Sequence, residues 1–72
     1  MNNAEYYKRA YPVGTRIRLL HMDDPYSPVP DGMTGTVDYV DDMGTLHMMW
    51  DNGRSLGICP DVDHFEVIKE GE

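Results

Sequence analysis

An Asn-Gly dipeptide at positions 52–53 constrains this chain more than any other short stretch, because it directly follows an alternating β pattern. Residues 45–50 read TLHMMW, which puts apolar side chains on one face of an extended strand. Asn-Gly favours a type I′ turn, whose two central residues both need positive φ. We therefore predict a tight hairpin to a second strand at 54–58, with Asp51 and Arg54 as a cross-strand ion pair.

Three further stretches have the composition of short strands. Residues 15–20 read TRIRLL, in which Arg16 and Arg18 alternate with apolar positions. Residues 35–40 and 65–68 are rich in β-branched and aromatic side chains. The intervening CPDVDH, at 59–64, is polar and contains proline, so it predicts a turn or a single 3₁₀ turn.

Five short strands, a long loop after the first and a turn before the last predict an all-β fold, a small SH3-like barrel over residues 11–68. No segment is long enough to add a helical second layer. The expected core contains ten apolar side chains: Ile17, Leu19, Val37, Leu46, Met48, Trp50, Leu56, Ile58, Phe65 and Val67.

The two ends of the chain lie outside the expected barrel. Residues 2–10 favour a short helix that Asn2 or Asn3 could cap and that Pro12 ends. A segment this short is marginal alone, so a flexible tail over residues 1–10 is the alternative. Residues 69–72 are expected to fray.

The long loop reads HMDDPYSPVPDGMTG over residues 21–35, with three prolines and three aspartates. The prolines restrict the unfolded chain, so we predict an ordered arm folded across the barrel. Its aspartates accept hydrogen bonds from nearby backbone N–H groups in turns.

Size and composition narrow the function classes. A chain of 72 residues supports one domain, and its single cysteine, Cys59, excludes an intrachain disulfide. The sequence has no apolar run of membrane-spanning length and no signal-peptide pattern, so a cytoplasmic protein is expected. The formal net charge is −7, and twelve of the thirteen carboxylates follow residue 22. This balance favours solubility or a basic protein partner over nucleic acid.

The motifs together resemble a small family of unknown function found in bacterial, bacteriophage and mobile-element genomes. The resemblance covers about residues 11–68. It rests on YPVGTR, MDDP, GTV, VDDMG and WDNG, which begin at Tyr11, Met22, Gly35, Val40 and Trp50. The family implies an SH3-like barrel and no established activity.

Two details qualify the family resemblance. Met49 stands where the family more often has a polar residue, which suggests a contact surface. GMTGTV, at residues 32–37, also resembles the glycine-spaced turn of KOW barrels, which touch RNA. Because this chain is acidic, we interpret that likeness as shared geometry and not as shared function.

Metal binding and nucleophilic catalysis each have a candidate, and neither has the spacing that such chemistry requires. His21 with Asp23 and Asp24, and Asp61 with Asp63 and His64, carry suitable ligand atoms but are better explained as solvated turn residues. A Cys59–His64 pair would need hydrogen-bond contact that nothing in the sequence fixes. We expect no metal, no cofactor and no enzymatic activity.

Protein binding is therefore the favoured function. SH3-like barrels commonly bind through the long loop, the third–fourth hairpin and the 3₁₀ turn. Trp50 is expected in the core and not at this surface. The expected partner-binding residues are Asp23, Asp24, Tyr26, Asp31, Tyr39, Met49, Asn52, Arg54 and His64.

The expected function is a non-enzymatic interaction module, an accessory or inhibitory protein that engages a basic host surface. One alternative is nucleic-acid binding through Lys8, Arg9, Arg16 and Arg18. Another is an oligomer that captures a small nucleotide between subunits. A homodimer through edge strands stays open.

Overall fold

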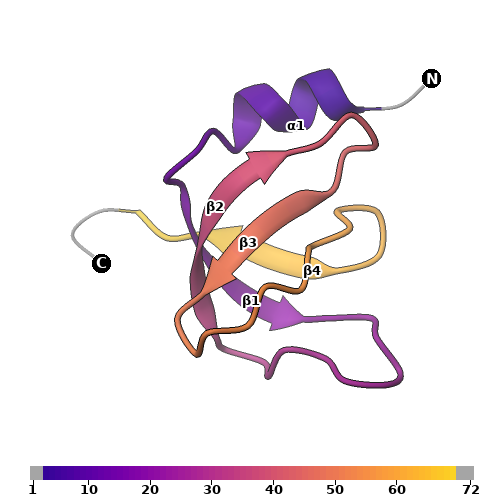
Figure 1. Cartoon of the computed structure of the whole chain (residues 1–72), viewed down its shortest axis with the longest axis vertical. Coiled ribbons are helices and arrows are strands. Elements are labelled where there is room, and N and C mark those ends of the chain that lie inside the picture. Colours follow the sequence, from indigo (N-terminus) through magenta and orange to yellow (C-terminus); the bar gives the residue numbers. More distant parts are fainter. Residues whose placement is uncertain (1–2, 70–72) are drawn as a thin grey trace.

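The computed structural model describes residues 3–69, which form one short helix and a four-stranded antiparallel sheet (Figure 1). The strands lie in the order β3-β2-β1-β4. The elements are α1 (Ala4–Ala10), β1 (Arg16–His21), β2 (Thr34–Val40), β3 (Leu46–Trp50) and β4 (His64–Val67).

The sheet buries one face, as the alternating patterns predict. In β1, Ile17 and Leu19 are fully buried while Arg16 is exposed. β1 pairs with β2 on one side and with β4 on the other, and a bulge after Leu19 shifts the register toward His21. Burying these apolar side chains on a shared face is the main force that holds a sheet of this size together.

Most of the expected core is confirmed. Seven of the ten predicted side chains are buried, Leu56 and Phe65 are partly buried, and Val67 is exposed. Val67 lies on β4, an edge strand, and 43% of its surface is exposed. Core side chains that the sequence analysis missed are Met22, Val29 and Val40.

The expected strand at 54–58 is wrong. Within the described residues this segment pairs with β3 through an isolated bridge between Ile58 and Leu46. The carbonyl of Leu56, which a regular ladder would use, instead accepts the indole N–H of Trp50 at 2.7 Å. The sheet therefore has four strands and is open, with β3 and β4 as its edges.

The turn at 51–53 also differs from the expected type I′ hairpin. Gly53 has φ +87°, but no non-glycine residue of the described chain has positive φ, so Asn52 does not adopt the I′ conformation. The Gly53 N–H donates to the carbonyl of Trp50, and the Trp50 N–H donates to that of Arg54. This is the geometry of a three-residue turn that ends in a left-handed glycine.

The short N-terminal helix is present as α1, but its expected cap is not. Asn3 occupies the N-cap position without a side-chain hydrogen bond, and Asn2 lies outside the described residues. Packing holds the helix instead: Ala4 is buried, and the ring of Tyr7 lies against Gly44. Seven residues gain little helical stability from their own hydrogen bonds, so these contacts with the β2–β3 turn are decisive.

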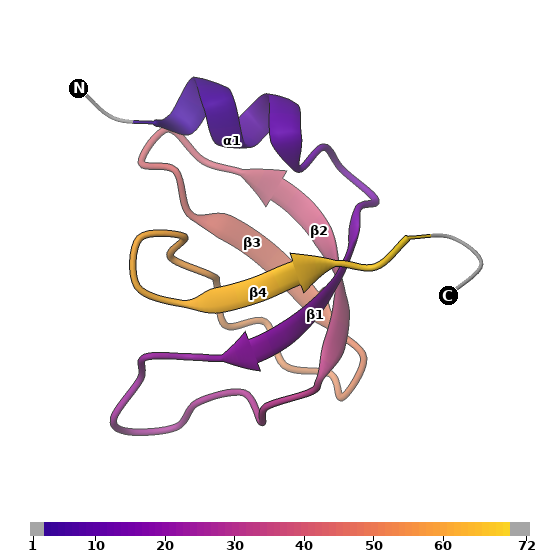
Figure 2. The ribbon, with the colours of Figure 1, turned by 180° about the vertical axis from the view of Figure 1, so that it is seen from behind.

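The loop between β1 and β2, residues 22–33, is called the arm below. It folds back onto the core, with Met22 and Val29 almost fully buried. Figures 1 and 2 show it at the opposite end of the long axis from α1. The turn at residues 59–63 lies at one side of the molecule between these two ends (Figure 2).

The structure bears on the expected C-terminal tail and on the expectation that no segment spans a membrane. Lys69 is exposed, and the remaining residues of the expected C-terminal tail, 70–72, lie outside the described part of the chain. Over residues 3–69 no helix has the length and apolarity needed to cross a membrane.

Candidate functional site

The nine residues expected to bind a partner do not form one surface. Tyr39 pairs with His47 near one end of the β2–β3 ladder, whereas Asn52 and Arg54 follow β3 at the other end. The predicted residues therefore divide into an arm group, a sheet-face group and a group near the start of β4.

The arm group is held in place by its own hydrogen bonds. Arg54 donates to the carbonyls of Ser27 and Pro28, at 2.6 and 3.3 Å, and so fastens the arm to the turn after β3. It does not form the expected ion pair with Asp51. One carboxylate oxygen of Asp24 accepts the N–H groups of Tyr26 and Ser27. Asn52 likewise accepts the Arg54 N–H.

Tyr26 is presented by this anchored arm with 92% of its surface exposed. It therefore does not cover the end of the sheet. A tyrosine held open on an ordered loop provides contact area at low conformational cost.

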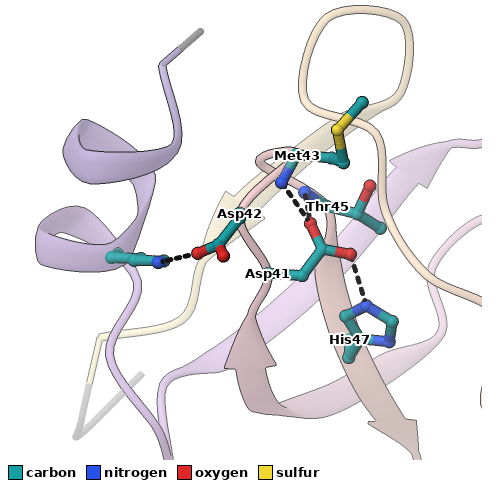
Figure 3. A network of polar contacts seen from close by, with 6 residues as sticks. Asp41, Asp42, Met43, Thr45 and His47 are labelled. Atoms are coloured by element: carbon teal, nitrogen blue, oxygen red, sulfur yellow. Dashed lines mark hydrogen bonds and ion pairs between the residues drawn. The ribbon is translucent and has the colours of Figure 1, made fainter.

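On the sheet face, Tyr39 is stacked and not free. Its ring lies parallel to that of His47, with 4.2 Å between centroids. Figure 3 shows Asp41 turned toward the His47 ring and toward the N–H groups of Met43 and Thr45. The hydrogen bond with His47, then that with Thr45, lowers the pKa of Asp41 below its ordinary value. Met49 is half exposed on the same sheet.

The third group lies where β1 meets β4. His64 pairs in register with His21, whose Nδ1 lies 3.2 Å from a carboxylate oxygen of Asp31. Asp31 and His64 therefore both lie beside His21, and both are exposed.

The basic residues proposed for nucleic-acid contact are mostly paired with carboxylates. Lys8 lies 2.6 Å from Asp42, an interaction visible in Figure 3, and this hydrogen bond raises the lysine pKa. Two of the other three cations form pairs of similar length. They are Arg16 with Asp51 and Arg18 with Glu66, each at 2.7 Å.

A different feature, which the sequence analysis did not find, is a groove around the turn at 59–63. Three hollows of about 390, 220 and 270 Å³ lie around this turn and share lining residues. Cys59 lines the first and second, Tyr7 and Pro60 line the first and third, and Asp63 lines the second and third. The three hollows therefore surround the turn on the side of the arm and on the side of α1. We call them together the acidic groove.

Asp63 fixes the walls of the acidic groove relative to one another. It is 7% exposed, and its carboxylate accepts the Asp23 N–H at 2.7 Å and the Cys59 N–H at 2.8 Å. One side chain thereby joins the start of the arm to the start of the turn. Hydrogen bonds to a buried carboxylate are strong, so the groove is preorganised.

The charges along the acidic groove have one sign. Asp23, Asp24, Asp61 and Asp63 line it, whereas none of the described lining residues is Lys or Arg. Among residues 3–69, no hydrogen bond reaches the side-chain carboxylate of Asp23 or the second carboxylate oxygen of Asp24. Asp61 has only a long contact, 3.5 Å, from the Tyr7 hydroxyl.

The second hollow, which three of these aspartates line, also has an apolar floor. Met22, Leu56 and Val62 contribute to it, with Pro25 from the arm. An apolar surface rimmed by acids suits a partner segment that combines apolar and basic side chains.

The sequence candidates for metal binding and catalysis are placed as follows. No set of three or more His, Cys, Asp or Glu side chains within residues 3–69 is arranged to hold a metal ion. Cys59 is exposed in the groove, and no hydrogen bond joins it to His64 in the described chain. Both carboxylate oxygens of Asp63 are occupied by backbone N–H groups.

Three comparisons with known proteins complete this description. The family model for "Domain of unknown function (DUF4314)" matches residues 2–68. No curated protein and no solved structure matches the chain.

Proposed function

We propose that this chain, which belongs to the DUF4314 family of unknown function, is a non-enzymatic protein-interaction module that engages a basic surface of its partner. The observation that carries the proposal is the acidic groove, which combines four aspartates, an apolar floor and no lining Lys or Arg among the described residues. Electrostatic complementarity of this kind sets specificity and speeds association.

The contact surface in this proposal differs in part from the one expected from sequence. Asp23, Asp24 and His64 stay in it, and Tyr26 extends it along the arm. Tyr39 and Met49 belong to the sheet face and have no place in this groove.

We also propose kinship with SH3-like barrels. The order β3-β2-β1-β4, the long loop after β1 and the Leu46–Ile58 bridge support it, because the bridge stands where a fifth strand would pair. Within this proposal the protein is an accessory or inhibitory protein of a phage or mobile element, located in the cytoplasm, that binds a basic host surface.

The test isolates a partner from the native host and compares two charge-reversal pairs. Asp23→Lys with Asp61→Lys reverses charge inside the groove, whereas Asp38→Lys with Glu5→Lys makes the same change in net charge outside it. We expect the groove pair to weaken partner binding by at least about tenfold, because it removes complementary charge at the contact. The outside pair is expected to weaken it far less.

Salt provides a second readout on the unchanged protein. We expect affinity to fall as the ionic strength rises from low to physiological values, since exposed charges are then screened. Binding that is insensitive to salt, or equal losses in the two charge-reversal pairs, would contradict the proposal.

Tyr26 provides a test of the arm. We expect Tyr26→Ala to weaken the same partner while leaving the unfolding midpoint nearly unchanged, because a side chain this exposed contributes little to the fold. A Tyr26→Ala variant that unfolds would show that the arm residue is structural.

A further inference from the structure

The end of the acidic groove nearest α1 has a lining unlike the rest. The third hollow, of about 270 Å³, is bordered by Tyr7 and Tyr11 from the N-terminal segment and by Phe65 from β4. These three residues are called the aromatic corner below. All three side chains are half-buried, so their rings are neither sealed in the core nor fully in solvent.

The rings of the aromatic corner have a defined arrangement. Tyr7 and Tyr11 are nearly parallel, at 25°, with centroids 6.3 Å apart. Phe65 is turned by 65° relative to Tyr11, with centroids 5.3 Å apart. Tyr6 packs edge-on against Tyr7 from outside the hollow, at 5.5 Å. Three rings in two orientations thus border one open space.

The charges around the aromatic corner favour a cation. The face of an aromatic ring is electron-rich and attracts an ammonium group within about 6 Å of its centroid. Burial raises the pKa of Tyr11, so its phenol stays neutral at physiological pH. Asp63 also lines this hollow, and Asp61 lies beside the Tyr7 hydroxyl. Apart from His64, no residue of the described chain that lines this hollow can carry a positive charge.

We propose that the aromatic corner is a subsite for one alkylammonium group, the side chain of a lysine, unmodified or methylated, on the partner. The proposal rests on the proposed function, because it assigns a particular residue type to the basic partner. The rest of the acidic groove then holds the neighbouring residues of the same partner segment. Cation–π contact at the corner adds directional recognition to the charge attraction of the aspartates.

The decisive experiment uses the unchanged protein and two small probes of the same shape. One is the acetylated methylamide of trimethyllysine, and the other is its neutral isostere with a tert-butyl group in place of the trimethylammonium. Each is titrated into the protein at low ionic strength and neutral pH, and the response is followed by NMR. We expect the cationic probe to shift the resonances of Tyr7, Tyr11 and Phe65, with at least about tenfold tighter binding than the isostere.

Variants test whether the rings themselves provide the attraction. Tyr11→Phe keeps the ring and should bind the cationic probe within about twofold of the unchanged protein, whereas Tyr11→Leu should lose at least about fivefold. Tyr6→Leu is the matched control, because it removes a tyrosine of the same N-terminal segment that does not line the hollow. Thermal unfolding establishes which variants are folded.

The outcomes separate this inference from the proposed function. Equal binding of the two probes, shifts away from the three aromatic residues or no binding of either probe would overturn the aromatic corner as a cation site. Since the two probes are compared on the unchanged protein, a Tyr11→Leu variant that fails to fold does not affect this result. If the corner fails while the groove charge reversals still weaken the partner, the interaction proposal stands without this subsite.

Discussion

Asp63 is the residue on which the geometry of the acidic groove depends most. Its buried carboxylate holds the N–H groups of Asp23 and Cys59, which belong to the arm and the turn. We expect Asp63→Ala to lower the free energy of unfolding by about 2–4 kcal/mol, since two N–H groups lose a charged acceptor. Asp63→Asn, which keeps one acceptor oxygen, should lose less. Urea denaturation measures both.

Asp61 provides the control for Asp63. It lies two positions earlier in the same turn, is exposed and has only the long contact from Tyr7. Asp61→Ala should change stability by no more than about 0.5 kcal/mol. Equal losses at the two positions would mean that Asp63 does not hold the arm and the turn together.

Asp51 controls how the fold responds to acid. Hydrogen bonds from Arg16 and then Thr34 lower its pKa below the ordinary value of 3.8. The charged carboxylate therefore contributes its full stabilisation at pH values above its ordinary pKa. As the pH falls from there toward the lower pKa of the folded state, this stabilisation is lost. We expect Asp51→Asn to lower the free energy of unfolding at neutral pH. The further loss of stability between neutral pH and pH values below about 4 should be smaller in this variant than in the unchanged protein.

Urea midpoints of both proteins across this pH range provide the measurement. Asp38→Asn is the matched control, because Asp38 is an exposed carboxylate of β2. If Asp51→Asn and Asp38→Asn show the same acid sensitivity, the Arg16–Asp51 pair does not contribute to it.

Single residues also explain why the groove could not be predicted. The sequence marks Asp61 and Asp63 as polar turn residues, and nothing in the local pattern indicates that one points inward and the other outward. Tyr7 and Tyr11 are four residues apart, but Phe65 is distant from both in the chain and meets the Tyr11 ring only in the folded structure. The one feature of the sequence that pointed toward the groove was the uneven distribution of carboxylates. It indicated a basic partner but not where on the fold that partner would bind.

Among the elements, β2 shows how one glycine allows two strands to approach. A Cβ at Gly35 would lie 2.7 Å from Cε3 of Trp50 and 3.1 Å from the Met49 carbonyl. The φ of Gly35 is not in the left-handed region, so space and not backbone conformation requires glycine here. We expect Gly35→Ala to cost about 1–3 kcal/mol of stability, measured by thermal or urea unfolding.

A double-mutant cycle tests the cause. In a Trp50→Leu background the ring that Cβ would meet is gone, so Gly35→Ala should cost at least about 1 kcal/mol less than in the unchanged protein. If Gly35→Ala costs as much stability in the Trp50→Leu background as in the unchanged protein, the clash is with the Met49 carbonyl or the strand backbone and not with the indole.

The elements that sequence could predict are those with a clear local period. The alternation in TRIRLL and TLHMMW was sufficient for β1 and β3, and the β-branched run was sufficient for β2. RSLGI at 54–58 has a similar pattern, yet it is not a strand. There, the indole N–H of Trp50 takes the Leu56 carbonyl, a tertiary contact that no local pattern reports. The same limit explains why Val29 in the arm was not recognised as core.

At the scale of the whole molecule, the charges separate into two environments. Three of the six basic residues are paired with carboxylates, whereas the acidic groove has carboxylates without a lining Lys or Arg in the described chain. Four carboxylates therefore line the acidic groove without a nearby lining cation, while Lys8, Arg16 and Arg18 are each paired with a carboxylate.

This distribution predicts the outcome of the nucleic-acid alternative. We expect the unchanged protein to give no electrophoretic shift of DNA or RNA at micromolar concentration and low salt, because its main cations are already paired and the rest of its surface repels phosphates. Replacing the three partner acids by amides, with Asp42→Asn, Asp51→Asn and Glu66→Gln together, should allow Lys8, Arg16 and Arg18 to produce a weak, salt-sensitive shift. Circular dichroism establishes that the triple variant is folded. A shift by the unchanged protein would instead mean that the ion pairs open on contact with phosphate, and nucleic-acid binding would then replace protein interaction as the favoured function.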